Sequence, residues 1–93
     1  SQYNELWKLL ATTIRDRGVL ERFVLERLGF SLSRVAPGVT VEEAANGLLD
    51  WADAMDRFYT LLRALRDARL HPDITGFVEP ILDTYADLCW GEA

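Results

Sequence analysis

The sequence predicts an all-α fold, a compact bundle of five or six short helices. Apolar residues recur at helical spacing along almost the whole chain. No run of alternating β-branched or aromatic residues lies between turn residues, as a strand would require. The 93 residues, 49% hydrophobic and 27% charged, suffice for one modest core. We expect residues 1–93 to form a single helical domain, excised from a larger multidomain protein.

Two apolar stripes indicate the first two helices. The second stripe closes at Gly29, a residue suited to the left-handed end of a helix. Leu25 falls off that stripe and is expected to be exposed. Arg27 falls inside it, so its charge must reach water or meet a carboxylate. After this helix, Ser31 is expected to cap one short helical turn before the break at residues 37–38. The two stripes comprise Leu6, Leu9, Leu10, Thr13 and Ile14, then Leu20, Phe23, Val24 and Leu28.

Cap signals indicate where the remaining helices begin. Thr40 and Glu43 have the spacing of a capping box ahead of a stripe that runs to Met55. Asp56 is expected to cap the next helix, which ends at His71 and Pro72.

Asp73 is expected to cap a last segment whose apolar phase continues to Cys89. Pro80 lies inside that phase, and proline is costly within a helix. The unbroken phase favours one helix kinked near residues 76–80, and two short helices are the alternative.

Charge is sorted by segment, which favours a protein partner. Residues 1–41 carry six bases and four acids, residues 42–56 five acids and no base. Residues 57–69 then carry four bases and one acid, and residues 70–93 five acids. Patches of opposite sign steer and register protein partners. The alternative is that oppositely charged helices neutralise each other within one molecule.

Composition and motifs argue against several function classes. The net charge of −5, without a basic tail, disfavours nucleic acid and anionic membranes as partners. No apolar run is long enough to span a bilayer. The single cysteine, Cys89, fits a reducing, cytoplasmic location. His71 precedes a proline, where a capping role is more common than catalysis. We expect no enzyme activity, no catalytic or metal-binding residue and no cofactor.

Three segments resemble the bacterial effector-associated domain 1 family. They are VLERFVLERLG at residues 19–29 with Leu32, Val35 and Ala36 after it, EEAANGLLDWA at residues 42–52, and LLRALRDAR at residues 61–69 followed by Pro72. The resemblance covers about residues 6–82. Two features depart from the family: Met55, Asp56 and Arg57 replace the usual glycine between the fourth and fifth helices, and the short Asn-rich loop expected after Pro72 is missing.

The resemblance implies a death-fold-like bundle that serves as an adaptor in bacterial conflict or immune signalling. Such domains are thought to pair homotypically and to bring an effector, such as a caspase-like or trypsin-like protease, to a nucleotide-dependent sensor. The implied partner is therefore a protein, either a same-type domain or a cognate effector or sensor.

The charge pattern suggests which residues would make such an interaction. One hypothesis pairs an acidic row, Glu43, Asn46, Asp50 and Asp53, with Arg22, Arg27 and Arg34 of another copy or a cognate domain. A second uses Arg57, Arg63, Arg66 and Arg69 to grip an acidic peptide or the acidic last helix of another copy, unless these arginines pair internally with Asp83 and Asp87. Trp7 and Tyr59 lie off their stripes and are candidate binding anchors. The alternative function is a structural or regulatory domain that contacts only its own parent enzyme.

Overall fold

The computed structural model describes residues 2–36, 38 and 40–90, and the side chains up to residue 85. In that part of the chain all regular structure is helical, which confirms the predicted all-α bundle of short helices. The elements are α1 (Gln2–Thr13), α2 (Arg17–Phe23), the π-helical turn η1 (Val24–Leu28), the 3₁₀ turn η2 (Leu32–Arg34), α3 (Val41–Ala54), α4 (Phe58–Ala68) and α5 (Pro72–Trp90).

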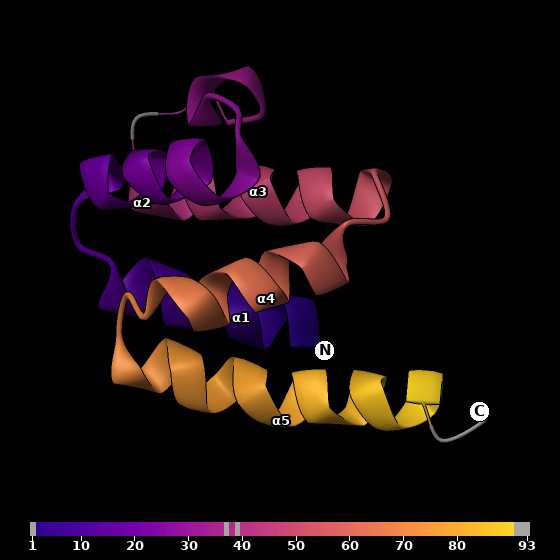
Figure 1. The fold of residues 1–93 in the computed structure, drawn as a ribbon. Coiled ribbons are helices and arrows are strands. Elements are labelled where there is room, and N and C mark those ends of the chain that lie inside the picture. Colours follow the sequence, from indigo (N-terminus) through magenta and orange to yellow (C-terminus); the bar gives the residue numbers. More distant parts are fainter. Residues whose placement is uncertain (1, 37, 39, 91–93) are drawn as a thin grey trace.

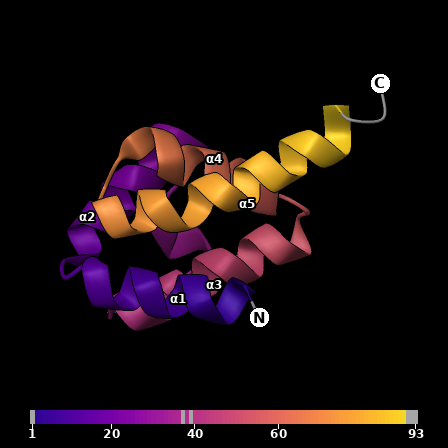
Figure 2. The ribbon, with the colours of Figure 1, turned by 90° about the horizontal axis from the view of Figure 1, so that it is seen from below.

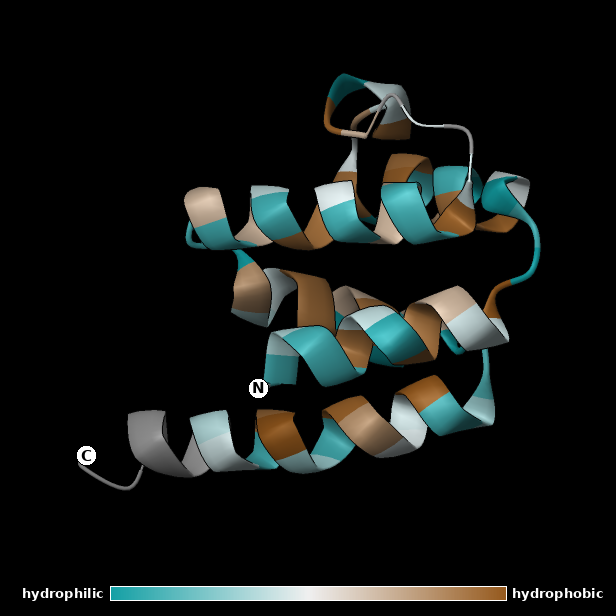
Figure 3. Cartoon of the chain, turned by 180° about the vertical axis from the view of Figure 1, so that it is seen from behind, coloured by the Kyte–Doolittle hydropathy of each residue, from teal (hydrophilic) through white to brown (hydrophobic). Residues whose placement is uncertain are grey.

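The helices stack in three levels in the view of Figure 1, with α2 and α3 above, α1 and α4 between, and α5 below. Helix α1 packs against α3 and α5, and α4 packs against α5. Seen from below, α1 and α3 run side by side along one edge (Figure 2). Seen from behind, these two helices lie nearest the viewer (Figure 3). The fully buried large side chains are Leu6, Leu10, Leu20, Val24, Leu32, Leu48, Leu61, Leu62, Leu65, Ile74 and Val78.

The second helix changes from α to π geometry halfway along its length. Gly29, with φ of 81°, ends it as predicted, and its N–H donates to the Val24 carbonyl five residues back. A π-turn holds one residue more than an α-turn, so the side chains after Val24 are rotated relative to the α-helical phase. Arg27 is exposed, so its charge reaches water, one of the two outcomes expected for it. Leu25 is exposed as predicted.

The predicted cap at Thr40 is confirmed, because its hydroxyl oxygen accepts from the Glu43 N–H at 3.1 Å. The predicted cap at Asp56 is wrong. This residue lies in the left-handed region, with φ of 55°, in the turn that ends α3. There the Arg57 N–H donates to the Ala52 carbonyl at 2.7 Å, a helix ending that glycine usually makes.

The predicted short turn follows Ser31, which is its N-cap residue but makes no capping bond, and the cap predicted at Asp73 is wrong. The Ser31 hydroxyl bonds the Ser33 hydroxyl, and no side-chain bond caps η2. His71 occupies the position before α5, and its Nδ1 accepts from the Asp73 N–H at 3.1 Å. Pro72 then opens the helix, where its missing N–H costs no intrahelical bond.

Helix α5 continues through Pro80 as one helix, so the two-helix alternative is wrong. Apolar side chains before and after the proline, Ile74, Val78 and Leu82, all lie in the core. Their burial stabilises both halves as one helix, although proline has no N–H to donate to the backbone. The predicted roles of the Asp87 and Cys89 side chains lie outside the described residues.

Candidate functional site

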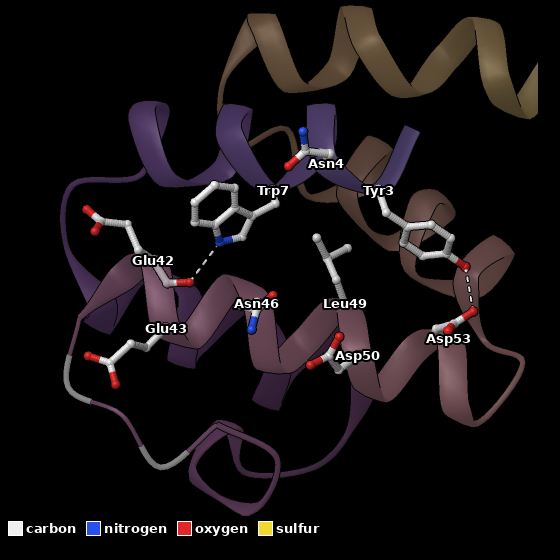
Figure 4. Close-up of a pocket in the computed structure, with 9 residues that line it drawn as sticks. All are labelled: Tyr3, Asn4, Trp7, Glu42, Glu43, Asn46, Leu49, Asp50 and Asp53. Carbon is white, nitrogen blue, oxygen red and sulfur yellow. Dashed lines mark hydrogen bonds between the residues drawn. The ribbon is translucent and has the colours of Figure 1, made fainter. Parts of the chain in front are cut away.

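A shallow groove of about 650 Å³ runs between α1 and α3 and is called the α1–α3 groove below (Figure 4). Two aromatic side chains of α1, Tyr3 and Trp7, lie across it from the acidic side chains of α3. The groove is lined by Tyr3, Asn4 and Trp7 of α1 and by Glu42, Glu43, Asn46, Leu49, Asp50 and Asp53 of α3.

Two hydrogen bonds join the helices at opposite ends of this groove (Figure 4). The indole N–H of Trp7 donates to the backbone carbonyl of Glu42 at 2.9 Å. The phenol of Tyr3 donates to Oδ1 of Asp53 at 3.2 Å, and its ring packs on Phe58 with centroids 4.4 Å apart. Burial, and secondly the Asp53 carboxylate, raises the pKa of Tyr3 above its ordinary value of 10.0. The two walls are therefore held at a defined separation.

The rim of the groove is acidic and exposed. Glu42, Glu43, Asp50 and Asp53 come from α3, and none of them lies in an ion pair with a described arginine or lysine. The ion pairs found among the described residues each join two side chains no more than four residues apart in the chain. Neutralisation of the acidic row by another helix of the same chain is thus absent from the described structure. The row presents its carboxylates to solvent.

The predicted arginines do not form one continuous patch. Arg22 lies 4.0 Å from Glu26 in the same helix, an exposed pair. Arg66 donates to the neighbouring Asp67 at 3.1 Å. Arg34 is exposed on η2.

Two other predicted arginines, 36 residues apart in sequence, are brought together. Arg27 of η1 and Arg63 of α4 line one depression between these elements. The Arg63 guanidinium also lies 5.8 Å from the centre of the Tyr59 ring. Among the described residues no base of α4 forms an ion pair with Asp83, so the internal pairing considered for that helix is not seen there.

Arg17 has a structural role that the sequence pattern did not reveal. Its Nε donates to the Gly38 carbonyl and its second guanidinium nitrogen to the Ala36 carbonyl, each at 2.9 Å. A further nitrogen contacts the Glu21 carboxylate. Arg17 thus anchors the segment between η2 and α3, a contact over about 20 residues that local spacing does not encode.

Part of the groove was foreseeable. Trp7 lies off the first apolar stripe, which was the signal for a rim residue or anchor. Tyr3 and Asn4 precede that stripe and carried no signal. Leu49 was expected in the core, and it is 4% exposed while lining the groove.

The described residues form neither a metal-binding cluster nor a membrane-spanning helix. No group of three or more His, Cys, Asp or Glu side chains there is placed to hold a metal ion. None of the described helices is both long and apolar enough to cross a membrane.

Comparisons with protein-family models, with curated proteins and with solved structures found no match to this chain. The helices of the described residues define the class of the protein as an all-α helical bundle. The resemblance to the effector-associated domain 1 family stays a prediction from the sequence segments named above.

Proposed function

We propose that this domain is a non-catalytic adaptor that binds a same-type or cognate protein domain through the α1–α3 groove. The observation that carries the proposal is the exposed acidic row of Glu43, Asp50 and Asp53, which has no arginine partner in the described chain. A row of carboxylates beside apolar side chains suits a basic, partly apolar surface of another protein.

Arginine is the side chain expected to meet these carboxylates. Nine of the ten bases in the chain are arginines, whose planar guanidinium can bind a carboxylate through two parallel hydrogen bonds. Arg27 is exposed and forms no ion pair among the described residues, so it is available to another molecule. Exposed pairs contribute only about 0–1 kcal/mol each, and a pair shielded beside the half-buried Trp7 contributes more.

The sequence resemblance supplies the biological setting of the proposal. An adaptor of this kind would act in the cytoplasm, in bacterial conflict or immune signalling. It would bring an effector protein to a sensor through contacts between like domains.

Charge reversal tests the interaction. Asp50→Arg is expected to weaken binding to the same-type or cognate domain by at least ~10-fold, because it places a cation in the middle of the acidic row. Asp83→Arg, which reverses an exposed acid on α5 outside the groove, is the matched control and should bind like wild type. Sedimentation velocity and isothermal calorimetry at low and high salt would measure the affinities.

A second charge reversal, on the partner molecule, identifies the surface that meets the acidic row. Arg27→Asp on the partner molecule should restore binding to Asp50→Arg, because the charges are exchanged across the contact. Wild-type affinity of Asp50→Arg would remove the acidic row from the interface. An isolated domain that stays monomeric and binds no cognate domain would instead favour a domain that contacts only its own parent enzyme.

A further inference from the structure

We propose that the α1–α3 groove binds an α-helix of a cognate protein, and that arginines on one face of this helix meet the carboxylates of Glu43, Asp50 and Asp53. This inference rests on the proposed function and deepens it, because it names the structure and the charge of the segment that enters the groove.

The groove carries charge of one sign only. Four carboxylates line it, those of Glu42, Glu43, Asp50 and Asp53, and no base is among the described residues that line it. None of the four forms an ion pair with a described arginine or lysine. A segment that complements this surface therefore brings positive charge.

Hydrogen bonds hold two of these carboxylates in place. The Thr40 hydroxyl donates to Oε1 of Glu43 at 3.0 Å, and the Tyr3 phenol donates to Oδ1 of Asp53 at 3.2 Å. Asp50 lies between them along α3 and is exposed. A partner that meets the row therefore has little side-chain freedom to remove at its two ends, which favours binding.

The opposite wall of the groove also suits arginine. Trp7 lies across the groove from the acidic side chains (Figure 4), and its bond to the Glu42 carbonyl fixes the indole. The face of an indole attracts a guanidinium, and arginine stacks on it while its nitrogens bind a carboxylate. The groove thus offers both kinds of contact to one arginine side chain.

The spacing of the carboxylates selects a helix as the partner. Along α3, Asp50 follows Glu43 by seven residues and Asp53 follows Asp50 by three, which correspond to rises of about 10.5 and 4.5 Å. A second helix laid along the groove has the same rise, so bases seven and three residues apart stand opposite the row. An extended strand repeats its same-face side chains every 6.8 Å or so, roughly, and matches neither distance.

The described helices of this chain do not carry a matching set of bases, so the helix belongs to another kind of protein. Helix α1 has one base, α2 and α4 have two each, and α3 and α5 have none. The turn η1 continues α2 and adds Arg27, but the bases there recur every five residues. One of them, Arg17, already binds the loop before α3.

Two synthetic peptides of equal composition test this inference on the whole chain. The first is an alanine- and glutamine-based helix with arginines at positions i, i+3, i+7 and i+10, which match the row in either direction. The second has the same arginines spread around the helix. The one-face peptide is expected to bind at least ~10-fold more tightly in isothermal calorimetry, and more weakly as salt is raised.

Further variants show whether the helix and the groove are both required. A one-face peptide with a central proline cannot form the helix and should bind no better than the spread peptide. Asp50→Asn should weaken binding of the one-face peptide by at least ~3-fold, because it removes the middle carboxylate. Asp83→Asn removes an exposed carboxylate of α5 outside the groove and should bind like wild type. Circular dichroism would verify that both variants are folded.

The outcomes distinguish this inference from the proposed function. Equal affinity for the one-face and spread peptides overturns the inference, as does tight binding of the proline peptide or no binding of any peptide. The adaptor function then depends separately on whether Asp50→Arg weakens binding of the cognate domain. Restoration of Asp50→Arg by Arg27→Asp on a second copy would support the adaptor function but overturn the inference, because the partner would be this chain itself.

Discussion

The indole of Trp7 and the backbone carbonyl of Glu42 form a hydrogen bond across 35 residues of sequence, at 2.9 Å. It joins α1 to the first turn of α3 and positions one wall of the α1–α3 groove. Trp7 therefore contributes both to stability and to the shape of the surface proposed to bind another protein domain.

Replacing the Trp7 indole measures how much its hydrogen bond contributes to the free energy of unfolding. Trp7→Phe should lower the free energy of unfolding by about 0.5–1.5 kcal/mol beyond the effect of the smaller ring, because the N–H donor is lost. Urea denaturation would give the value. Trp51→Phe is the matched control: the ring packs against Phe30 and its N–H makes no described hydrogen bond. Equal losses in both variants would show that the bond adds nothing.

Gly47 allows the loop before α3 to approach that helix closely. A Cβ at this position would lie 2.6 Å from the Ala36 Cβ and 2.7 Å from the Val35 carbonyl oxygen. Gly47→Ala should therefore destabilise the fold by about 1–3 kcal/mol, although alanine favours a helix by about 1 kcal/mol.

Gly76 provides the matched comparison for Gly47. It lies in α5 with nothing within 4 Å of an added Cβ, so Gly76→Ala should stabilise the protein by up to about 1 kcal/mol. Thermal unfolding of both variants measures the difference. A stabilising Gly47→Ala would contradict the close approach of the loop.

Asp56 adopts a left-handed backbone in the turn that ends α3. Since a side chain is strained at a φ of 55°, Asp56→Gly should stabilise the domain by about 1 kcal/mol. Asp50→Gly, in the regular part of α3, should change stability in the opposite direction because glycine disfavours a helix. Urea denaturation of the two variants tests the pair, and destabilisation by Asp56→Gly would argue against the left-handed turn.

Tyr3 makes the stability depend on alkaline pH. Its pKa is raised in the folded state by burial and then by Asp53, so the native protein holds the phenol proton more tightly than the unfolded chain. This contribution is complete below the ordinary pKa of 10.0 and is lost as the pH rises through the folded value. The unfolding free energy should therefore fall in this range.

Two variants test whether the Tyr3 phenol causes the fall in stability at alkaline pH. Tyr3→Phe should remove the part of the decline due to this phenol, measured by denaturation at increasing pH. Asp53→Asn keeps an acceptor but removes the charge, so it should reduce the decline without abolishing it. An unchanged pH profile in Tyr3→Phe would exclude the phenol as its source.

The helix positions were readable from the sequence because each helix carries its own local signal. The apolar stripes, the ending at Gly29 and the cap at Thr40 depend on spacings of three or four residues. The errors at Asp56 and Asp73 have a common cause. Both residues have good capping chemistry, but the turn at the end of α3 and the N-terminal pair His71 and Pro72 occupy the positions they would need.

The candidate site was readable only in part. The acidic row lies on one helix, so its spacing alone placed Glu43, Asp50 and Asp53 on one face. The sequence did not predict that Arg27 and Arg63 line the same depression, because their proximity depends on where η1 meets α4. The π-turn that contains Arg27 was not predicted, because it has no reliable local signature in this sequence.

By itself, the sequence determined an all-α fold, the ends of several helices and the acidic row on α3. These properties follow from contacts between residues close together in the chain. Only the tertiary structure decided that α1 would border the acidic row, that Arg27 and Arg63 would line one depression, and that Arg17 would hold a distant loop. Such relationships depend on which apolar faces bury one another, and that choice is made by the packing of the whole chain.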